Sequence, residues 1–282
     1  MKFLLPVEKA AHRLRDNMFS YLRTFDWFRL VSLWTIRDDI ILITKQFDDH
    51  RLTFSPHETI GRSLFHKGQF QRDLALRVLD LIGDQSGKIL LELGANIGTH
   101  SVYLMRAGGF ERAICIEPEP HNVVLLKHNL LQNDLTETTT VVECAVGDRE
   151  GFAELYLHRG NSGGASLFNG DGHPSIKVPL RRVDSILTEN NVPSNSVGLV
   201  WMDIEGAEPD ALRSMTDLVK HRVPILMEYM PSRVEPAKTK EMIDRLSDHY
   251  GRCIVFSRKK IEREMDIHCL PDDGSHDILL LP

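Results

Sequence analysis

The sequence has few cysteines, and their spacing suggests no use for them beyond packing. Its 282 residues include four, Cys115, Cys144, Cys253 and Cys269, and no two of them have the C-x-x-C spacing of zinc or redox sites. Cys115 and Cys144 lie inside apolar, strand-like runs, where cysteine behaves as a small core residue. The sequence therefore predicts neither a disulfide framework nor a zinc site.

Long apolar runs and an excess of positive charge are also absent. No stretch reaches the roughly 18 uninterrupted apolar residues of a membrane span. A proline and charged residues interrupt the apolar opening at Met1–Leu5, and no small-residue cleavage site of a secretory signal follows. The net charge is −6 and the pI is near 6.1, whereas proteins that bind nucleic-acid phosphates usually carry a basic field. We therefore expect a cytoplasmic protein with no transmembrane segment and no nucleic-acid partner.

The first 45 residues differ from the rest by their density of aromatic side chains, which include Tyr21, Phe25, Trp27, Phe28 and Trp34. Helical periodicity predicts two or more short helices in this extension, with the main domain over residues 46–282. We expect the helices to pack on the main domain and to help cover the substrate, because such stripes are more often core than interface. Contact with a membrane surface or a protein partner is the alternative, and the oligomeric state stays open.

From Leu74 onward, short apolar runs alternate with helical patterns. The expected strands are 88–93, 112–116, 139–146, 197–203, 223–229, 253–256 and 277–281, and the expected helices are 74–82, 98–107, 119–133, 209–220 and 238–249. Segments 151–157 and 176–183 alternate like an antiparallel hairpin around a Gly-rich loop. Strands that alternate with helices predict βαβ units and a mostly parallel sheet, which is a Rossmann-like α/β fold.

The segment 88–101, KILLELGANIGTHS, predicts a cofactor site. A strand enters a Gly-rich turn that opens a helix, and this arrangement directs backbone N–H groups at a ligand. Gly94 permits the tight turn, Ala95 and Asn96 follow within it, and Gly98 permits close approach of the chain. The dinucleotide fingerprint would require glycine where Asn96 and Thr99 stand, so the turn departs from that pattern.

Two acids near this turn favour S-adenosylmethionine over NAD. Glu92 precedes Gly94 by two residues, in a position that is usually apolar in dehydrogenases but faces the cofactor's amino-acid end in methyltransferases. Glu117, followed by Pro118, ends the second strand about 20 residues later and can accept hydrogen bonds from both ribose hydroxyls. Capping of the next helix is the alternative role for Glu117. The third strand, around Ala145, is expected beside the adenine.

The motifs ELGANIG, IEP, CAVGD, NSGGAS, VDSIL, WMDIEGAE and HDILLLP, in this order over about residues 88–282, resemble the FkbM-type methyltransferases. The resemblance implies a class I fold with a seven-stranded sheet and an antiparallel last strand, S-adenosylmethionine as the cofactor, and a small-molecule or glycan acceptor that carries a hydroxyl. The family more often has Asp where this chain has Glu92. The cofactor motif then corresponds to Glu92, Gly94, Asn96, Gly98 and Glu117, and the acidic block to Asp203, Glu205 and Glu208.

Acids at two neighbouring strand ends are the candidates for catalysis. Asp203 ends the fourth parallel strand at the edge where doubly wound sheets bind ligands, Glu205 lies two residues on, and Glu228 ends the next strand. Clustered carboxylates raise one another's pKa and can yield a general base. His100, just after the Gly-rich turn, is a further candidate base, although an ordinary first-turn helix residue would look the same.

Other roles for these acids stay open. Glu208 could have no role beyond stabilising the N-terminus of the helix that follows it. Asp203 could have no role beyond orienting the cofactor's ammonium group. The cluster could also hold a divalent cation through its oxygens, but a metal is not favoured because no complete set of ligands is evident.

The Gly-rich loop from Gly160 to His173 allows two interpretations. It could be a mobile flap over the acceptor site, or it could be a long hairpin turn. For the whole chain, an NAD-dependent oxidoreductase and a non-catalytic module that binds a partner are the competing functions.

Overall fold

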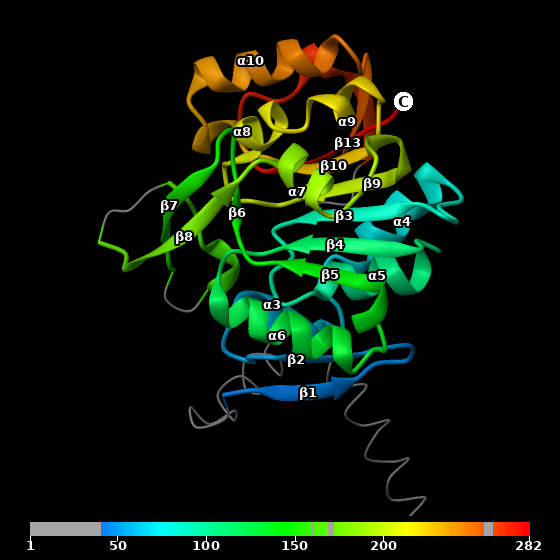
Figure 1. Ribbon diagram of the computed structural model, residues 1–282, viewed down its shortest axis with the longest axis vertical. Coiled ribbons are helices and arrows are strands. Elements are labelled where there is room, and N and C mark those ends of the chain that lie inside the picture. Colours follow the sequence, from blue (N-terminus) through cyan, green and yellow to red (C-terminus); the bar gives the residue numbers. More distant parts are fainter. Residues whose placement is uncertain (1–40, 159–160, 169–171, 257–261) are drawn as a thin grey trace, which may run out of the picture.

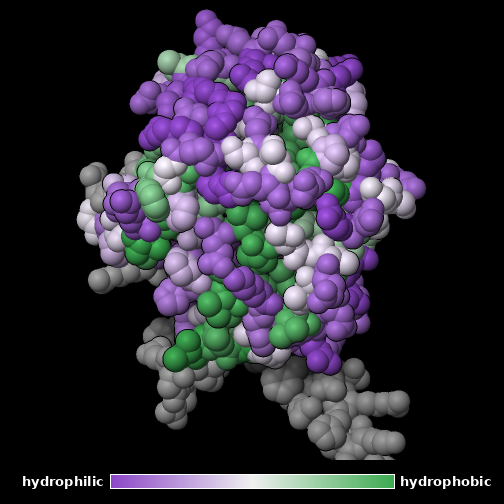
Figure 2. Space-filling view, viewed as in Figure 1, coloured by the Kyte–Doolittle hydropathy of each residue, from purple (hydrophilic) through white to green (hydrophobic). Residues whose placement is uncertain are grey.

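The computed structural model describes residues 41–158, 161–168, 172–256 and 262–282, which carry two layers of helices around a central sheet (Figure 1). The helices predicted before residue 45 therefore lie almost wholly outside the described residues. None of the described helices is long and apolar enough to cross a membrane. Figure 2 shows a mainly hydrophilic face, with hydrophobic residues gathered toward its lower half.

The central sheet has eight strands in the order β12-β11-β13-β10-β9-β3-β4-β5. Their bounds are β3 Ile89–Leu93, β4 Arg112–Ile116, β5 Thr139–Val142, β9 Val197–Met202, β10 Ile225–Tyr229, β11 Arg252–Phe256, β12 Glu262–Asp266 and β13 His276–Leu280. The five strands from β5 to β10 run parallel, and β13 is antiparallel to both of its neighbours. The predicted fold class is confirmed. The eighth strand, β12, was missed because four of its five residues are charged.

Helices cover both faces of this sheet because its strands are apolar on both sides. Leu90 of β3 and Leu199 of β9 belong to one core with α3 (Thr59–Lys67), α4 (Arg72–Ile82), α5 (Thr99–Ala107) and α6 (Pro120–Leu131). Leu91 and Val200 belong to a second core on the other face, with α7 (Val183–Glu189), α8 (Glu208–Arg213), α9 (Thr216–Lys220) and α10 (Pro236–Ser247). The sequence prediction missed α3 and α7.

The helix predicted over 209–220 is two helices, α8 and α9. The break lies at Ser214, whose hydroxyl donates to the Ala211 carbonyl (2.8 Å) and accepts from the Val183 N–H (3.0 Å). This pair of bonds satisfies backbone groups at the helix end and ties it to the start of α7, so the chain does not continue as one helix.

The strand predicted over 139–146 is divided between two sheets. After β5 the chain turns at Cys144, whose N–H donates to the Val142 carbonyl (3.1 Å). The next strand, β6 (Ala145–Val146), then pairs with β8 (Ser175–Arg181), which pairs with β7 (Gly151–Tyr156) in a three-stranded sheet. The predicted hairpin is thus confirmed, and the division carries Ala145 away from the central sheet to the edge where a ligand would lie.

A separate two-stranded sheet precedes the main sheet. β1 (Ile43–Gln46) pairs with β2 (Arg51–Phe54), and β2 packs against α6. β1 crosses residue 45, the predicted boundary of the N-terminal extension. Exposed apolar side chains in this region of the molecule include Ile41, Leu42, Val124 and Leu131.

The carboxyl ends of β3, β4 and β9 are joined by backbone hydrogen bonds. The N–H groups of Gly94 and Ala95 both donate to the Ile116 carbonyl (2.9 Å each), and the Asp203 N–H donates to the Leu93 carbonyl (3.0 Å). A Cβ atom on Gly94 would lie 1.9 Å from the Asp203 carbonyl oxygen. Only glycine therefore allows the turn after β3 to approach the chain after β9.

A pair of glycine substitutions tests this close approach. Gly87 and Gly94 both have a positive φ, but a Cβ on Gly87 would meet nothing within 4 Å. We expect Gly87→Ala to lower the free energy of unfolding by about 1 kcal/mol through backbone strain alone. Gly94→Ala adds a backbone clash and should cost at least about 3 kcal/mol. Urea unfolding of both variants measures the difference, and equal losses would contradict the account.

Candidate active site

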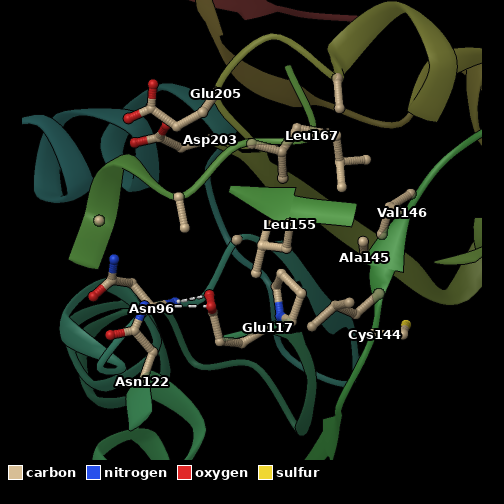
Figure 3. A pocket seen from close by; sticks show the side chains of 17 residues that line it. Asn96, Glu117, Asn122, Cys144, Ala145, Val146, Leu155, Leu167, Asp203 and Glu205 are labelled. Carbon is tan, nitrogen blue, oxygen red and sulfur yellow. Dashed lines mark hydrogen bonds between the residues drawn. The ribbon is translucent and has the colours of Figure 1, made fainter. Parts of the chain in front are cut away.

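A cleft opens beside the carboxyl ends of β3, β4 and β9 (Figure 3). It holds about 530 Å³ including the space at its open mouth, within the roughly 300–1,000 Å³ of ligand sites. Its lining combines backbone of the Gly-rich turn, carboxylates and a group of apolar side chains. The lining residues are Gly94, Asn96, Ile116, Glu117, Pro118, Asn122, Cys144, Ala145, Val146, Leu155, Gly163, Ala165, Leu167, Asp203, Ile204, Glu205 and Ala207.

The Gly-rich turn presents backbone to this cleft. Asn96 has a φ of 52°, and its side-chain oxygen accepts from the Ile97 N–H (2.7 Å). Gly94 and Asn96 line the cleft, whereas Ala95 and Gly98 do not. Gly98 has a φ of 84°, and a Cβ there would lie 2.7 Å from a methyl of Leu126 on α6. Ala95 and Gly98 therefore fix the turn without facing the ligand space.

Glu117 is buried at the end of β4 and is held in place by three donors. Its carboxylate accepts from the N–H groups of Asn96 (2.8 Å) and Glu119 (2.9 Å) and from the side chain of Asn122 (3.3 Å). Burial raises the pKa of Glu117 to about 7. The helix-capping role belongs instead to Glu119, which accepts from the Asn122 N–H. Asn122, which sequence reasoning missed, lines the cleft beside Glu117.

An apolar slot faces Glu117 across the cleft. Cys144, Ala145 and Val146 form one wall, where the chain passes from β5 into β6. Leu155 of β7 and Leu167 of the Gly-rich loop also line it, and Figure 3 shows both projecting toward the same space. Such a slot suits a flat apolar ring. The contributions of Leu155 and Leu167 were missed because they depend on how the hairpin folds back over the sheet.

The described part of the Gly-rich loop docks on the acidic block. The Ser166 hydroxyl donates to the Glu205 carbonyl (2.9 Å), and Ser166 exchanges two backbone hydrogen bonds with Tyr156 (2.9 and 3.1 Å). Gly163, Ala165 and Leu167 line the same cleft as Glu117. The described part of the loop therefore borders the cofactor side of the cleft. The flap and the long hairpin turn both stay predictions, and residues 159–160 and 169–171 lie outside the described residues.

Glu92 is buried beneath the floor of the cleft and does not line it. Its side chain is fully buried between β3 and α5, where Ser101 donates a hydrogen bond to one carboxylate oxygen. The other oxygen has no hydrogen-bond partner among the described residues. Burial raises the pKa of Glu92 to about 8. An unpaired buried carboxylate oxygen is costly, so this atom marks a place for a donor from a ligand or water.

The predicted catalytic acids converge. One carboxylate oxygen from each of Asp203, Glu205 and Glu228 lies within 4.8 Å of the other two, and Asp203 and Glu205 also line the cleft. Figure 3 shows Asp203 and Glu205 side by side above the turn. Burial, reinforced by the neighbouring charge of Glu228, raises the pKa of Asp203 well above its usual range.

Two of these acids have further partners. Glu205 has a φ of 55° and forms an ion pair with Arg233, and Glu228 accepts from the Ser275 hydroxyl (2.9 Å). The spacing of the three carboxylates would also suit the oxygen ligands of a divalent cation. The geometry alone is thus compatible with carboxyl groups that act on an acceptor or with a metal ion.

The remaining sequence candidates lie outside the cleft lining. Glu208 begins α8, and its carboxylate accepts from the N–H groups of Ile204 (3.1 Å) and Gly206 (3.0 Å), so it holds the loop after β9 in place. His100 is buried, with its ring centroid 4.6 Å from that of Trp201. Its Nε2 has no partner among the described residues, and burial lowers its pKa to about 4.

Comparison with known proteins identifies the family of the chain that carries this cleft. The family model described as the methyltransferase FkbM domain matches residues 92–252, more than half of the chain. The chain belongs to this family. The predicted resemblance is therefore confirmed, and the cofactor is S-adenosylmethionine.

Individual relatives are distant. The 2-O-methyltransferase NoeI of Sinorhizobium fredii is 24% identical over 140 residues, 44% of this chain and 56% of NoeI, so the chain spans little more than half of that protein. The methyltransferase sdnD of Sordaria araneosa is 23% identical over 209 residues, 64% of this chain and 79% of sdnD. Among solved structures, an S-adenosylmethionine-dependent O-methyltransferase from Thermotoga maritima has a TM-score of 0.42 at 10% identity, covering 82% of this chain and 73% of its own.

The buried acids predict an unusual dependence of stability on pH. The pKa values of Glu92, Glu117 and Glu208 are raised by burial to about 8, 7 and 7. The folded protein therefore binds more protons than the unfolded chain, and the free energy of unfolding falls as pH rises. His100, with its lowered pKa, acts in the opposite direction, but only below its ordinary value of 6.5.

We therefore expect stability to fall between about pH 6.5 and 8, where the acids alone titrate. Glu92→Gln should reduce this fall, because a neutral amide replaces the group with the highest of the three pKa values. Urea unfolding of both proteins at the two pH values measures the effect. Stability that rises across this range, or an equal fall in the variant, would contradict it.

Proposed function

We propose that the protein is an O-methyltransferase that transfers the methyl group of S-adenosylmethionine to a hydroxyl of a sugar, glycan or natural product. The observation that carries this proposal is the meeting of two unlike groups in one cleft. Glu117 and the apolar slot lie on one side, and the acids Asp203 and Glu205 lie on the other, with Glu228 close behind them. This is the pair of functions that methyl transfer to a neutral hydroxyl requires.

The residues of the cofactor side fit the parts of S-adenosylmethionine. A carboxylate offers about four acceptor positions, and Glu117 uses three for the chain's own donors, which leaves capacity for a ribose hydroxyl. The slot of Cys144, Ala145, Leu155 and Leu167 fits the adenine ring. Gly94 and Asn96 present backbone to the amino-acid end. Glu92 does not line the cleft, so its predicted role toward that end would be exercised from below the turn, where one of its oxygens has no partner among the described residues.

On the acceptor side, we propose Asp203 as the general base. When bound, the cofactor supplies an activated methyl group on a sulfonium. Burial and the neighbouring charge of Glu228 raise the pKa of Asp203, so its ionised carboxylate is a stronger proton acceptor than that of an exposed aspartate. The Asp203 carboxylate would accept the hydroxyl proton as the methyl–sulfur bond breaks and the new C–O bond forms, with S-adenosylhomocysteine as the leaving group. Glu205, whose ion pair with Arg233 holds it beside the cleft, assists in orienting the hydroxyl.

A divalent cation is not part of this proposal. The existing partners of Glu205 and Glu228, the Arg233 guanidinium and the Ser275 hydroxyl, already stabilise the two acids. A cation would have to compete with Arg233 for Glu205. His100, which is buried away from the cleft lining, is an alternative base that has less support.

The class of acceptor follows from the charge of the site. Carboxylates accept hydrogen bonds and repel anions, so a neutral hydroxyl compound fits better than a phosphate or an acid. The distant relative named a 2-O-methyltransferase supports transfer to oxygen. Coverage of the acceptor by residues 1–45, and cytoplasmic localisation, stay predictions of the sequence.

A transfer assay tests the proposal. Incubation with S-adenosylmethionine labelled in the methyl group and a panel of methyl glycosides should identify a labelled acceptor. With that acceptor, Asp203→Asn should lower kcat by at least about 100-fold and leave the affinity for S-adenosylhomocysteine within about 3-fold, because the base acts only on the acceptor.

Two controls accompany this assay. Asp210→Asn removes a nearby acid that pairs with Arg213 outside the cleft, and should leave kcat unchanged. Dialysis against EDTA should also leave activity unchanged. Wild-type activity in Asp203→Asn would overturn the assignment of the base. Loss of activity on EDTA treatment, with recovery on Mg²⁺, would show that the acids hold a metal ion instead.

A further inference from the structure

Two asparagines act on β2 as a neighbouring strand would. Asn129 lies in the last turn of α6, and Asn133 follows four residues later. The Thr53 N–H donates to the Asn129 side-chain oxygen (2.7 Å), and the Asn129 amide donates to the Thr53 carbonyl (3.1 Å). Asn133 makes the same pair of bonds with Arg51 (2.9 and 2.7 Å). A side-chain amide carries the donor and acceptor of a peptide group, so it can replace one.

The spacing of the two elements makes this pairing possible. Four residues advance a helix by about 6 Å, and two residues advance a strand by about 6.6 Å. Asn129 and Asn133 therefore meet Thr53 and Arg51 in register. Both asparagines are almost completely buried, with Asn129 at 0% exposed, so their amides must find partners inside the protein.

Asn129 alone extends this pairing to the cofactor turn. Its amide also donates to the Ile97 carbonyl (2.7 Å), in the turn between β3 and α5. The Asn133 amide instead donates to the backbone carbonyl of Asn129 (2.7 Å). Both asparagines thus form a pair of hydrogen bonds with β2, but only Asn129 also forms a hydrogen bond with the cofactor turn.

All the hydrogen-bonding positions of the Asn129 side chain are occupied. Its oxygen accepts from the Thr53 N–H and from the Gln132 side chain (2.6 Å), and its amide donates to the Thr53 and Ile97 carbonyls. With two acceptor and two donor positions used, the amide has one orientation. The position of the Ile97 carbonyl is therefore fixed by β2, more than 40 residues earlier in the chain.

Ile97 is in turn connected to the cofactor side of the cleft. The Ile97 N–H donates to the side chain of Asn96 (2.7 Å), and the Asn96 N–H donates to Glu117 (2.8 Å). Asn96 has a positive φ, a conformation that is unfavourable for residues other than glycine and needs support from its surroundings. A displacement of Ile97 would move Asn96 and alter the environment of Glu117.

We propose that Asn129 is a positioning residue for the cofactor-binding turn, through which β2 sets the affinity for S-adenosylmethionine. This inference rests on the proposed role of the turn and of Glu117 in cofactor binding. Asn129 does not line the cleft, so it acts through Ile97 and Asn96.

Matched substitutions in the full chain test the proposal. Asn129→Leu and Asn133→Leu each remove both hydrogen bonds to β2, so both should lower the melting temperature. Calorimetric titration with S-adenosylhomocysteine should show affinity reduced at least about 10-fold in Asn129→Leu and by less than about 2-fold in Asn133→Leu, because only Asn129 contacts the turn. The amide resonances of Gly94 and Gly98 should shift in Asn129→Leu alone.

Asn129→Asp and Asn133→Asp serve if the leucine variants do not fold. Each keeps the oxygen that accepts from β2 and loses the amide donor, so only Asn129→Asp loses its bond to Ile97. Equal affinities in the members of either pair, with the wild type binding normally, would overturn the role of Asn129. Absence of binding by the wild type would instead contradict the proposed function itself.

Discussion

The contact on which the rest of the site depends is the approach of two backbones, at Gly94 after β3 and Asp203 after β9. No side chain fits between them, since a Cβ on Gly94 would lie 1.9 Å from the Asp203 carbonyl oxygen. This approach places the cofactor turn and the acidic block at one point of the sheet edge. In the proposed function, a methyl donor at the turn and a hydroxyl at the acids would lie within reach of each other, and orientation of this kind supplies a large part of the catalysis of group transfer.

Burial of carboxylates is the second constraint. Glu92, Glu117, Asp203 and Glu208 are all removed from solvent to a degree that raises their pKa values. The free-energy cost of burying each carboxylate is offset in a different way. Glu117 and Glu208 accept backbone N–H groups, Asp203 shares its surroundings with Glu228, and Glu92 retains an oxygen without a partner among the described residues. Glu117 and Glu208, which accept backbone N–H groups, thereby hold the turn after β3 and the loop after β9 in place.

The sequence predicted the central sheet and the Gly-rich turn at its edge, because hydrophobic alternation and glycine spacing are local signals. The prediction failed where tertiary contacts determine the bounds of a strand or the residues that reach the cleft. β12 is too charged to resemble a strand. The strand predicted over 139–146 is divided by a turn at Cys144, and no local sequence pattern predicts that turn. Asn122 and Leu167 reach the cleft only after α6 and the hairpin fold back. Asn129 gave no signal at all, because an asparagine in a helix becomes informative only when its partner, Thr53, is known.

The central claim is that this cleft binds S-adenosylmethionine through Glu117. Calorimetric titration with S-adenosylhomocysteine of the wild type, Glu117→Ala and Glu119→Ala tests it most directly. Glu119 is the matched control, because it is a buried acid two residues away that only caps α6. The account predicts micromolar binding by the wild type and by Glu119→Ala, and its loss in Glu117→Ala. Undiminished binding in Glu117→Ala, or no binding by the wild type, would contradict it.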